Sequence, residues 1–435
     1  MLEPLYTAAE MQAAEAGHDV DQLMERAGSA LAEEILARFP AAHTFAGVFG
    51  GGANGGDGRI AAELLRTAGW EERSLGDADV VIDALFGTGF RGAPREDASG
   101  LIRAMNEAGA PVVAVDIPSG VDASTGEVPG DAVRAALTVT FHGRKVGHEV
   151  APGRFRRGEV VVADIGLEHA ETEHALATPA ILDLVPRRSP QDTKYTAGSV
   201  LVVGGSPGMT GAVCLTAEAA FRADAGYVAV AAPAESLPVI EARLLEPVKR
   251  PLDEVWSAAE RAGALAIGPG LGRERTELVR RLLTEIDLPA VVDADGLYEL
   301  EPVDRRADTV ITPHSGELAR LLGVEANWVD AHRLEALRRA VERFRCVVLL
   351  KGDGTLVGAP DAGAVACGGF PSLATAGTGD VLTGVVGSFL AKGMDGRLAA
   401  VAAAVAHTQA AVAAPHRSGL MAGDLLDALP RVLDA

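Results

Sequence analysis

The chain has 435 residues, of which 48% are apolar and 23% charged; this composition excludes global disorder and predicts two or three domains. Its 39 basic and 60 acidic residues give a formal charge of −21, which argues against a nucleic-acid partner or an anionic membrane surface. The three cysteines form no CxxC pair, and the most apolar stretch, residues 398–415, is too polar to span a membrane. We therefore expect a cytoplasmic protein without a disulfide framework or a structural zinc site.

Two helices are expected within residues 7–38, where Thr7 and Glu10 have the spacing of a capping box. Five short apolar or β-branched runs that end in glycine then predict buried parallel strands. They are TFAGVFG (44–50), DVVIDALFG (79–87), PVVAVDIPSG (111–120), LTVTFHG (137–143) and EVVVADIG (159–166). Helical patterns lie between these runs, so residues 1–170 predict a doubly wound α/β domain.

Residues 171–190 have weak periodicity and are interpreted as a connector. The alternation of strands and helices then begins again. Six strand patterns occur between residues 199 and 352, and helices fit at 211–225, 274–285, 330–344, 379–391 and 397–413. Residues 191–435 therefore predict a second, larger α/β domain. Ligands of open α/β sheets bind beyond the carboxyl ends of the strands, so the loops at those ends are the candidate sites.

Glycine-rich loops and strand-end carboxylates mark the first domain. The segment GGGANGGDG, residues 50–58, separates a strand from a helix, which is typical of loops whose N–H groups bind an anion; a tight turn is the alternative. Asp83 lies inside a predicted strand, where a carboxylate is costly unless it is paired or bound to a cation. Asn54, Asp83 and Ser119 stand at three strand ends and suggest a hard-cation site, although a cap or a core hydrogen bond is the default interpretation of any one of them.

These segments, with LYTAAEMQAAE and QLMERAG upstream, resemble the N-terminal half of the NAD(P)H-hydrate repair enzymes, a Rossmann-like epimerase domain. The resemblance implies that Asn54, Asp83 and Ser119 bind potassium and that Asp116 is the acid/base for epimerisation at C6 of the hydrated nicotinamide. It also implies a hydrate-binding set: Ala53, Asn54, Gly55, Gly56, Asp57, Gly87, Thr88, Gly89, Phe90, Arg91, Gly92, Ala93 and Asp116.

The first domain departs from this family in two respects. Ala53 replaces the first asparagine of the family's NNGGD run, which removes a hydrogen-bonding side chain beside the ligand. The stretch before the strand at 79–87 is also too short for a strand and helix that the family has there. An active second domain beside a degenerate epimerase domain is therefore an alternative.

The second domain carries a lysine loop and a GTGD motif. The segment TAGTGDVLTG, residues 375–384, leads into a helix, so N–H groups at the helix start form an anion hole with Asp380 at its mouth. This arrangement suits phosphoryl transfer, in which the aspartate takes a proton from the accepting hydroxyl; a simple helix cap is the alternative. Lys351, one of five lysines beside thirty-four arginines, ends a strand and is interpreted as a nucleotide-phosphate contact rather than a solvated strand end.

Six motifs in order, GGSPGMTGA, GPGLG, DADGL, TPHSGE, KGDGT and ATAGTGD, resemble the ADP/ATP-dependent NAD(P)H-hydrate dehydratase, a ribokinase-like fold, from residue 192 to the end. The resemblance implies that Asp380 is catalytic and that the hydrate is bound by Ala212, Gly270, Gly272, His314 and Asp380. It implies that ADP or ATP, with magnesium, is bound by Lys351, Gly352, Asp353, Gly354, Thr355 and Gly379. Ser315 and Asp353 stand where the family has proline and alanine.

The leading hypothesis is a bifunctional repair enzyme. It epimerises the R and S forms of hydrated NADH or NADPH and dehydrates the S form at the expense of ADP or ATP. The alternatives are a ribokinase-like small-molecule kinase that stops at the phosphoester and a nicotinamide-nucleotide binder without catalysis. The expected partners are these small molecules, with no nucleic acid and no membrane, and the chain is expected to form a homo-oligomer.

Overall fold

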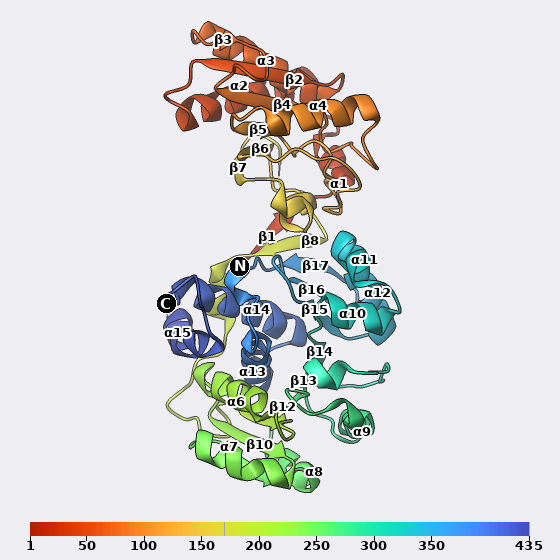
Figure 1. Ribbon diagram of the computed structural model, residues 1–435, viewed down its shortest axis with the longest axis vertical. Helices are drawn as coiled ribbons and strands as arrows, with labels where there is room; N and C mark the ends of the chain where they lie inside the picture. The colour runs from red at the N-terminus through yellow and green to blue at the C-terminus, as the bar shows by residue number, and fades with distance from the viewer. Residues whose placement is uncertain (169, 435) are drawn as a thin grey trace. The chain divides into compact units, whose positions relative to one another are not determined.

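The structure is a computed structural model that describes residues 1–168 and 170–434. Residues 169 and 435, which fall in the expected domains 1–170 and 191–435, lie outside the described residues. The chain divides into two compact units. The N-terminal unit comprises residues 4–175 with 330–334, and the C-terminal unit comprises residues 1–3, 176–329 and 335–435 (Figure 1). Among the described residues, no helix combines the length and apolarity that crossing a membrane requires.

The N-terminal unit is built on a six-stranded parallel sheet with the order β3-β2-β4-β5-β6-β7. Five of its strands confirm the predicted ones: β2 (Thr44–Phe49), β4 (Val80–Ala84), β5 (Val112–Val115), β6 (Leu137–Phe141) and β7 (Glu159–Ala163). The sixth, β3 (Glu71–Glu72), is a two-residue edge strand. Residues 68–79 contain only β3 and turns, so the connection from the preceding helix to β4 is short.

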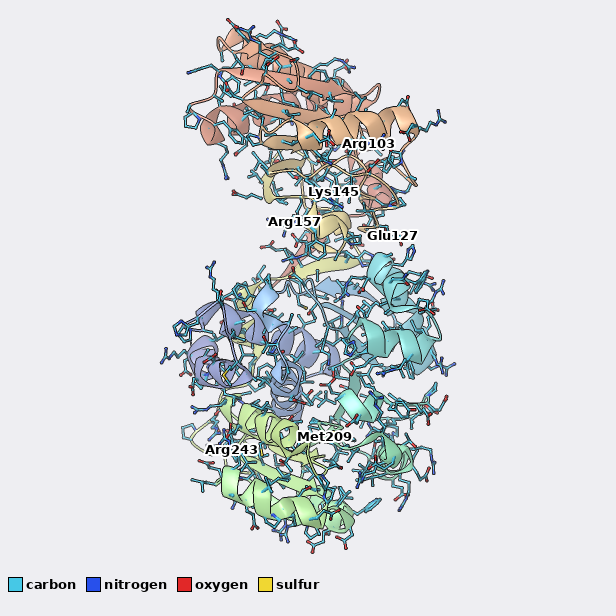
Figure 2. The ribbon with its side chains drawn as sticks, in the orientation of Figure 1. Arg103, Glu127, Lys145, Arg157, Met209 and Arg243 are labelled. Atoms are coloured by element: carbon cyan, nitrogen blue, oxygen red, sulfur yellow. The ribbon has the colours of Figure 1, made fainter. Side chains whose placement is uncertain are left out.

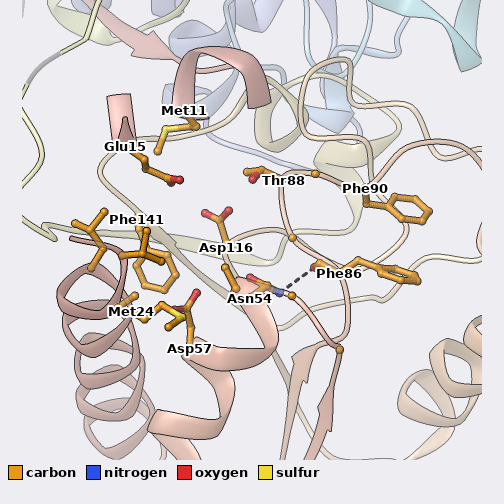
Figure 3. Close-up of a pocket in the computed structure, with 18 of the residues that line it drawn as sticks. Met11, Glu15, Met24, Asn54, Asp57, Phe86, Thr88, Phe90, Asp116 and Phe141 are labelled. Carbon is orange, nitrogen blue, oxygen red and sulfur yellow. Dashed lines mark hydrogen bonds between the residues drawn. The ribbon is translucent and has the colours of Figure 1, made fainter. Parts of the chain in front are cut away.

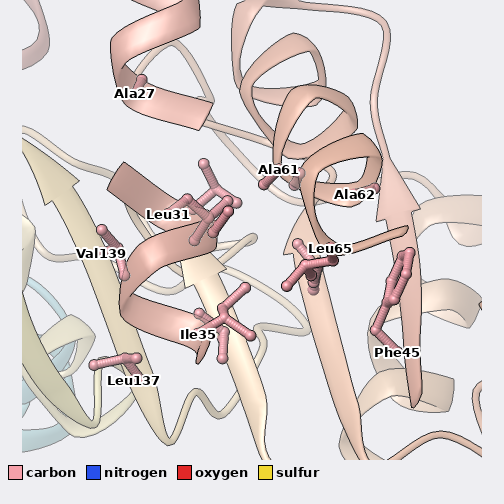
Figure 4. Close-up of a cluster of buried hydrophobic side chains, with 14 of the residues drawn as sticks. Ala27, Leu31, Ile35, Phe45, Ala61, Ala62, Leu65, Leu137 and Val139 are labelled. Atoms are coloured by element: carbon pink, nitrogen blue, oxygen red, sulfur yellow. The ribbon is translucent and has the colours of Figure 1, made fainter. Parts of the chain in front are cut away.

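Helices cover both faces of this sheet, which confirms a doubly wound domain. They are α1 (Ala8–Glu15), α2 (Val20–Arg38), α3 (Ala53–Thr67), α4 (Glu96–Glu107) and α5 (Val146–Glu149). Thr7 and Glu10 form the expected capping box of α1. On one face, α2 buries residues four apart, including Leu31 and Ile35, against Leu65 of α3 and the sheet (Figure 4). On the other face, Ile102 of α4 joins a second apolar cluster.

The C-terminal unit contains an eleven-stranded sheet with the order β1-β8-β17-β16-β15-β14-β13-β12-β9-β10-β11. The six predicted strands are present and parallel: β9 (Ser199–Val203), β10 (Tyr227–Ala232), β12 (Ala264–Ile267), β13 (Ala290–Val292), β14 (Thr309–Ile311) and β15 (Val347–Leu350). The sequence did not indicate β1 (Leu2–Leu5), β8 (His174–Ala177), β11 (Val248–Pro251), β16 (Leu356–Ala359) and β17 (Ala362–Ala366). The segment expected as a connector thus includes β8, followed by a 3-10 helix at Pro179–Leu184.

The helices of this unit pack on both sides of the sheet. They are α6 (Thr210–Arg222), α7 (Leu237–Arg243), α8 (Val255–Ala259), α9 (Thr276–Glu285), α10 (Ser315–Leu322), α11 (Ala326–Ala331), α12 (Arg333–Phe344), α13 (Thr378–Ala391), α14 (Gly396–Ala413) and α15 (Ala422–Asp434). Helix α13 is buried along most of its length, and it is pressed against α6. This packing fixes the position of the GTGD segment at the start of α13.

Candidate active sites

A cavity of about 670 Å³ opens in the N-terminal unit where the strand order reverses. The chain passes from β2 to β3 on one side and then to β4 on the other, and ligands of open α/β sheets bind at such a point. Eight of the predicted hydrate-binding residues line the cavity: Ala53, Asn54, Asp57, Gly87, Thr88, Gly89, Phe90 and Asp116 (Figure 3). The other five, which are Gly55, Gly56, Arg91, Gly92 and Ala93, do not line it.

Two of those five residues have visible roles in shaping the loops. A side chain at Gly55 would lie 2.1 Å from the carbonyl oxygen of Gly50, so this position must be glycine for the loop to fold closely onto α3. Arg91 lies beside the Asp122 carboxylate at 3.5 Å and donates a hydrogen bond to Ser124. It therefore braces the loop after β4 against the segment that follows β5.

Asp116 is held as a carboxylate at the wall of the cavity. Its Oδ1 accepts hydrogen bonds from Lys145 Nζ at 2.5 Å and from Thr140 Oγ1 at 2.8 Å. Burial alone would raise the pKa of Asp116, but the charge and hydrogen bond of Lys145 hold that pKa below its usual range. Lys145 (Figure 2) is 1% exposed and is not among the predicted site residues; its rarity as one of five lysines was the available signal.

His148 fixes the backbone on which Asp116 sits. Its Nδ1 accepts a hydrogen bond from the Lys145 backbone N–H at 3.0 Å, so Nε2 carries the proton and donates to the Asp116 carbonyl oxygen at 2.9 Å. Burial lowers the pKa of His148 to about 3, so the ring is neutral at pH 7. Asp116 has φ 64°, a left-handed conformation that few residues adopt without support. His148 is therefore a positioning residue for the carboxylate.

Asp57 faces the same cavity from α3 but has a different environment. Its side chain is buried, and burial, followed by the charges of Asp116 and Glu15, raises the pKa of Asp57 to about 8. Glu15 comes from the end of α1, and burial with the charge of Asp116 raises its pKa as well. One side of the cavity therefore combines an ionised carboxylate with a carboxyl that holds its proton at pH 7.

The three predicted potassium ligands are linked at the edge of the cavity, which Asn54 lines. Ser119 donates to both oxygens of Asp83, through Oγ at 2.6 Å and through its N–H at 2.8 Å. Asn54 Nδ2 donates to the Phe86 carbonyl at 2.9 Å, and the Phe86 N–H donates to Ser119 Oγ at 2.9 Å. Burial raises the pKa of Asp83 to about 6, against the hydrogen bonds of Ser119, and no cationic side chain among the described residues forms an ion pair with it. A buried carboxylate without such a cationic partner, close to the hydroxyl of Ser119 and the carbonyl of Phe86, is compatible with a monovalent cation.

The second candidate site lies at the corresponding point of the C-terminal unit, where β9 lies between β10 and β12. The loops after β9 and β12 are joined by hydrogen bonds from Gly205 N to the Pro269 carbonyl and from Ser206 N to the Gly270 carbonyl, at 3.0 and 2.7 Å. A side chain at Gly270 would lie 3.3 Å from Cβ of Ala212, so these two predicted residues adjoin. The N–H of Gly272 donates to Asp295 Oδ2 at 3.0 Å.

Asp380 stands in the first turn of α13 beside a buried ion pair. Lys351 Nζ donates to Asp293 Oδ1 at 2.6 Å, and Thr383 Oγ1 donates to Asp293 Oδ2 at 2.7 Å. Burial, and then the negative charge of Asp293, raises the pKa of Asp380 to about 7, although Lys351 opposes this. Asp293 is not among the predicted site residues, although the motif VVDADGL ends a buried strand with its carboxylate.

The remaining predicted residues of this unit surround Lys351. His314 is the N-cap of α10: its Nδ1 accepts a hydrogen bond from the Gly316 N–H at 3.0 Å, and its side chain is 58% exposed. Glu317 completes that capping box and lies 3.8 Å from Lys351 Nζ. A side chain at Gly379 would lie 3.4 Å from the same Nζ atom. The loop Gly352, Asp353, Gly354 and Thr355 follows Lys351 directly, and Thr355 Oγ1 closes it by donating to the Gly352 carbonyl at 3.1 Å.

Comparisons with known proteins agree with this division into two sites. The family model of NAD(P)H-hydrate dehydratase matches residues 200–431, and the model described as YjeF-related protein N-terminus matches residues 20–75 and 70–147. A ribokinase-like protein from Enterococcus faecalis covers 61% of this chain and 98% of its own, with a TM-score of 0.53 at 21% identity. This likeness confirms the expected ribokinase-like fold of the C-terminal unit.

Named relatives are similar over both units or over one. The ADP/ATP-dependent NAD(P)H-hydrate dehydratase of Bacillus subtilis, co-crystallised with ATP and Mg²⁺, has a TM-score of 0.55 at 29% identity and covers 60% of this chain and 97% of its own. The bifunctional NAD(P)H-hydrate repair enzyme of Moorella thermoacetica is 41% identical over 82% of this chain and 73% of its own. The enzyme of that name from Coxiella burnetii is 35% identical over 98% of this chain and 97% of its own. With this similarity over both units, the chain belongs to the family of bifunctional NAD(P)H-hydrate repair enzymes.

Proposed function

We propose that this protein epimerises the hydrates of NADH and NADPH in its N-terminal unit and dehydrates the S epimer in its C-terminal unit, using ADP or ATP. The main support is the pair of acid–base groups at the two points where strand order reverses. Asp380, with a pKa raised to about 7, can act as a general base at neutral pH, and Asp116 is a carboxylate that faces a cavity of about 670 Å³. That volume is in the range of small-molecule sites.

In the C-terminal unit, Asp380 takes the proton of the C6 hydroxyl while the terminal phosphate of the nucleotide transfers to that oxygen. The first N–H groups of α13 have no helical partner and stabilise the charge that develops on the transferring phosphate. Phosphate then leaves with the loss of a proton from C5, which restores the double bond. Magnesium on the nucleotide phosphates would neutralise charge during the transfer, and the ATP and Mg²⁺ of the Bacillus subtilis relative support this assignment.

In this mechanism Lys351 contacts a nucleotide phosphate in addition to the Asp293 carboxylate. It is ion-paired with Asp293, so its charge is already partly neutralised. We propose that the loop from Lys351 to Thr355, with Gly379, binds the nucleotide, and that Ala212, Gly270, Gly272 and His314 bind the hydrate. In this assignment Lys351 contacts a phosphate through an N–H that does not bond to Asp293, because an ammonium has three donors.

In the N-terminal unit, Asp116 moves the proton that epimerisation at C6 requires, and Lys145 keeps its carboxylate ionised. Potassium at Asn54, Asp83 and Ser119 would supply the positive charge that the buried Asp83 lacks and would hold the loop at Phe86 in place. The eight cavity-lining residues of the predicted set, Ala53 to Asp116, bind the hydrate. We also propose that the protein is a cytoplasmic homo-oligomer. Light scattering after size-exclusion chromatography tests this assembly.

The test is the recovery of reduced nicotinamide absorbance from a purified mixture of R and S hydrates, with ADP, with ATP and without nucleotide, in the presence of magnesium and potassium. Full recovery, faster than spontaneous epimerisation, is the expected result. Recovery of the S fraction alone would reduce the proposal to a dehydratase beside a degenerate epimerase domain, the alternative favoured by Ala53 and the short β3. Folded protein that recovers nothing with either nucleotide would refute both activities.

A further inference from the structure

Four titratable side chains line the cavity of the N-terminal unit, and they come from four different parts of the fold. Glu15 lies at the end of α1, Asp57 in α3, Asp116 after β5 and Lys145 after β6. Helix α2, which packs along α3, contributes apolar side chains only: Val20, Leu23, Met24 and Ala27. The cavity therefore holds three carboxyl groups and one ammonium. Figure 3 shows the carboxyl groups of Glu15, Asp57 and Asp116 directed toward the same space.

All three N–H donors of the Lys145 ammonium form hydrogen bonds within the protein. Its three donors reach Asp116 Oδ1 at 2.5 Å, Thr140 Oγ1 at 2.8 Å and the Phe141 carbonyl at 3.0 Å. An ammonium has only three N–H groups, so none remains for a second carboxylate. Both hydrogen bonds to the Asp116 side chain end on Oδ1, and within the described residues no hydrogen bond reaches Oδ2. Asp116 is thus held as an anion with one oxygen left for a ligand.

Asp57, unlike Asp116, has no stabilising partner for a negative charge within the described part of the chain. Its side chain is 8% exposed, and no hydrogen bond or ion pair of the described residues reaches its carboxyl group. A buried carboxyl without a donor, beside a carboxylate whose counterion is already used, is most stable with its proton on. The raised pKa of Asp57, about 8, has this origin: burial first, then the charges of Asp116 and Glu15. Two carboxyl groups on one cavity wall therefore differ in protonation at neutral pH.

We propose that Asp57 is a second catalytic residue of the epimerase site, the proton donor that works with the Asp116 carboxylate. This assignment rests on the proposed epimerase activity and assigns the acid to one residue and the base to the other. Pairs of titratable groups whose environments separate their protonation are how one site performs acid and base chemistry at a single pH. Asp57 was predicted only as a residue that contacts the hydrate.

The step balances with these two groups and one water molecule. Asp57 gives its proton to the C6 hydroxyl, the C6–O bond breaks with its electron pair to form water, and the ring nitrogen lone pair forms a C6=N1 iminium. Water then adds to the other face of C6, and Asp116 takes the proton that this water loses. Asp57 is left ionised and Asp116 protonated, and proton exchange with solvent restores both. The reverse reaction uses the same two groups in exchanged roles.

The test uses the full chain without added nucleotide, so that the dehydratase is inactive, and follows the approach of purified R hydrate to the epimer equilibrium by chromatography. Asp57→Asn and Asp116→Asn are compared with Asp97→Asn, a substitution of an exposed aspartate in the first turn of α4 outside the cavity. We expect Asp57→Asn to lower kcat about 100-fold or more, with KM within threefold. The parent should lose activity above pH 8, where Asp57 loses its proton. The residual rate of Asp57→Asn should show no such loss, and Asp97→Asn should match the parent.

Two results distinguish this inference from the proposed function. A parent chain that does not accelerate epimerisation refutes the epimerase activity and the inference with it. An active parent with an Asp57→Asn variant that keeps more than half of the rate, or the same loss above pH 8, refutes the role of Asp57 alone. Infrared difference spectra of parent against Asp57→Asn, recorded at pH 6 and at rising pH through 8, provide a readout besides activity. A protonated carboxyl band that disappears near pH 8 is expected, and its absence would overturn the assignment.

Discussion

Each candidate site contains a lysine that forms an ion pair with one aspartate while a second carboxyl nearby has no cation of its own. Lys145 pairs with Asp116, and Asp57 is left protonated; Lys351 pairs with Asp293, and burial with the Asp293 charge raises the pKa of Asp380. With only five lysines in the chain, two of them form this arrangement. The lysine stabilises one anion, and that anion raises the pKa of its neighbour.

Replacing Asp380 by asparagine tests the base of the dehydratase. Asparagine has nearly the same size but cannot accept the hydroxyl proton, so we expect kcat to fall about 10²- to 10⁴-fold. Nucleotide affinity, measured by calorimetry, should change by less than threefold. Asp361→Asn is the matched control, because Asp361 is an exposed turn residue with φ 56°, a conformation that asparagine accepts. An Asp380→Asn variant with a tenth or more of the parent kcat would contradict this assignment.

The pH dependence of stability should show the unusual state of Asp57. Its pKa is about 8 in the folded chain and about 4 in an unfolded one, so its contribution to stability is complete below pH 4 and is lost as pH rises to 8. Asparagine carries no proton to lose. We therefore expect Asp57→Asn to match the parent at pH 4 and to exceed its free energy of unfolding at pH 8 by about 1 kcal/mol or more, with about 5 kcal/mol as the upper bound.

Urea unfolding of both chains at several pH values, followed by a probe in the N-terminal unit, measures this difference. Asp97→Asn should stay within about 1 kcal/mol of the parent between pH 4 and pH 8, since its side chain is exposed and only its charge at the start of α4 is lost. A gap between Asp57→Asn and the parent that does not grow with pH would show that Asp57 titrates normally.

The positions of several site residues were predictable from the sequence, whereas their partners were not. Asp83 and Asp116 interrupt or end an apolar run, and Asp380 belongs to the GTGD motif at a predicted helix start; both patterns are visible without a structure. Lys145 lies 29 residues after Asp116, and Lys351 lies 58 residues after Asp293. Such pairs form only when the sheet brings the carboxyl ends of separate strands together: β5 and β6 are neighbours, and β13 and β15 lie on either side of β14. Residue spacing along the chain therefore gave no sign of these pairs. The raised pKa of Asp57 follows from the same three-dimensional arrangement.

At the scale of elements, the contact of α13 with α6 determines where the GTGD segment lies. A Cβ at Gly384 of α13 would be 2.2 Å from the Thr216 carbonyl oxygen of α6, so this position allows the helices their close approach. Gly384→Ala must push the helices apart, and we expect a loss of about 1–3 kcal/mol in the free energy of unfolding, with weaker dehydratase activity.

Gly387, one turn further along α13, offers a matched control. A Cβ there would lie 3.3 Å from Cγ1 of Val200, a contact that a small shift relieves. Alanine also gains about 1 kcal/mol of helix propensity over glycine, so Gly387→Ala should stay within about 1 kcal/mol of the parent. Chemical denaturation of both variants measures the difference in their free energies of unfolding. Equal midpoints for the two substitutions would mean that the approach of α13 to α6 is not a constraint.

The strands also show which local patterns the sequence carries. The parallel strands were predictable because both faces are buried, which requires unbroken apolar runs. The antiparallel pair β16 and β17 was not, because LVGA and AGAVA are short, rich in alanine and glycine, and adjoin a glycine loop. Strands of small residues lack the β-branched and aromatic signal on which such predictions depend. The strand β3 was not predicted because two residues are too few to form a recognisable pattern.

At the scale of the whole molecule, each unit repeats one design: a run of parallel strands, which antiparallel strands extend in the C-terminal unit, a reversal of strand order beside its first long strand, and glycine loops at that point. The N-terminal unit keeps this design although residues 68–79 contain only β3 and turns. The shortening falls at the sheet edge beyond β2, whereas Asn54, Asp83 and Asp116 follow or lie in the central strands β2, β4 and β5. A trimmed edge is therefore compatible with an intact set of site residues.

Because each unit has its own core and its own proposed ligand, we expect two thermal transitions that respond to different additions. Potassium that binds only the folded N-terminal unit stabilises it by about 2.7 kcal/mol at 100 times its Kd. For a unit of this size each kcal/mol raises the Tm by about 2–4 °C, so one Tm should rise by about 5–10 °C. ADP with magnesium should raise the other. Differential scanning calorimetry in potassium chloride and in choline chloride of equal ionic strength measures both effects.

Asp83→Asn identifies the transition that potassium affects. Asparagine keeps the size of the side chain and removes the buried charge that calls for a cation, so the Tm of the N-terminal unit should no longer differ between potassium and choline. The same variant removes the cost of burying an unpaired anion, so in choline it should be at least as stable as the parent. The ADP response should be unchanged, because Lys351 and Asp380 belong to the other unit. A potassium shift of equal size in Asp83→Asn would place the cation elsewhere, and a shift of both transitions would show that potassium acts without a specific site.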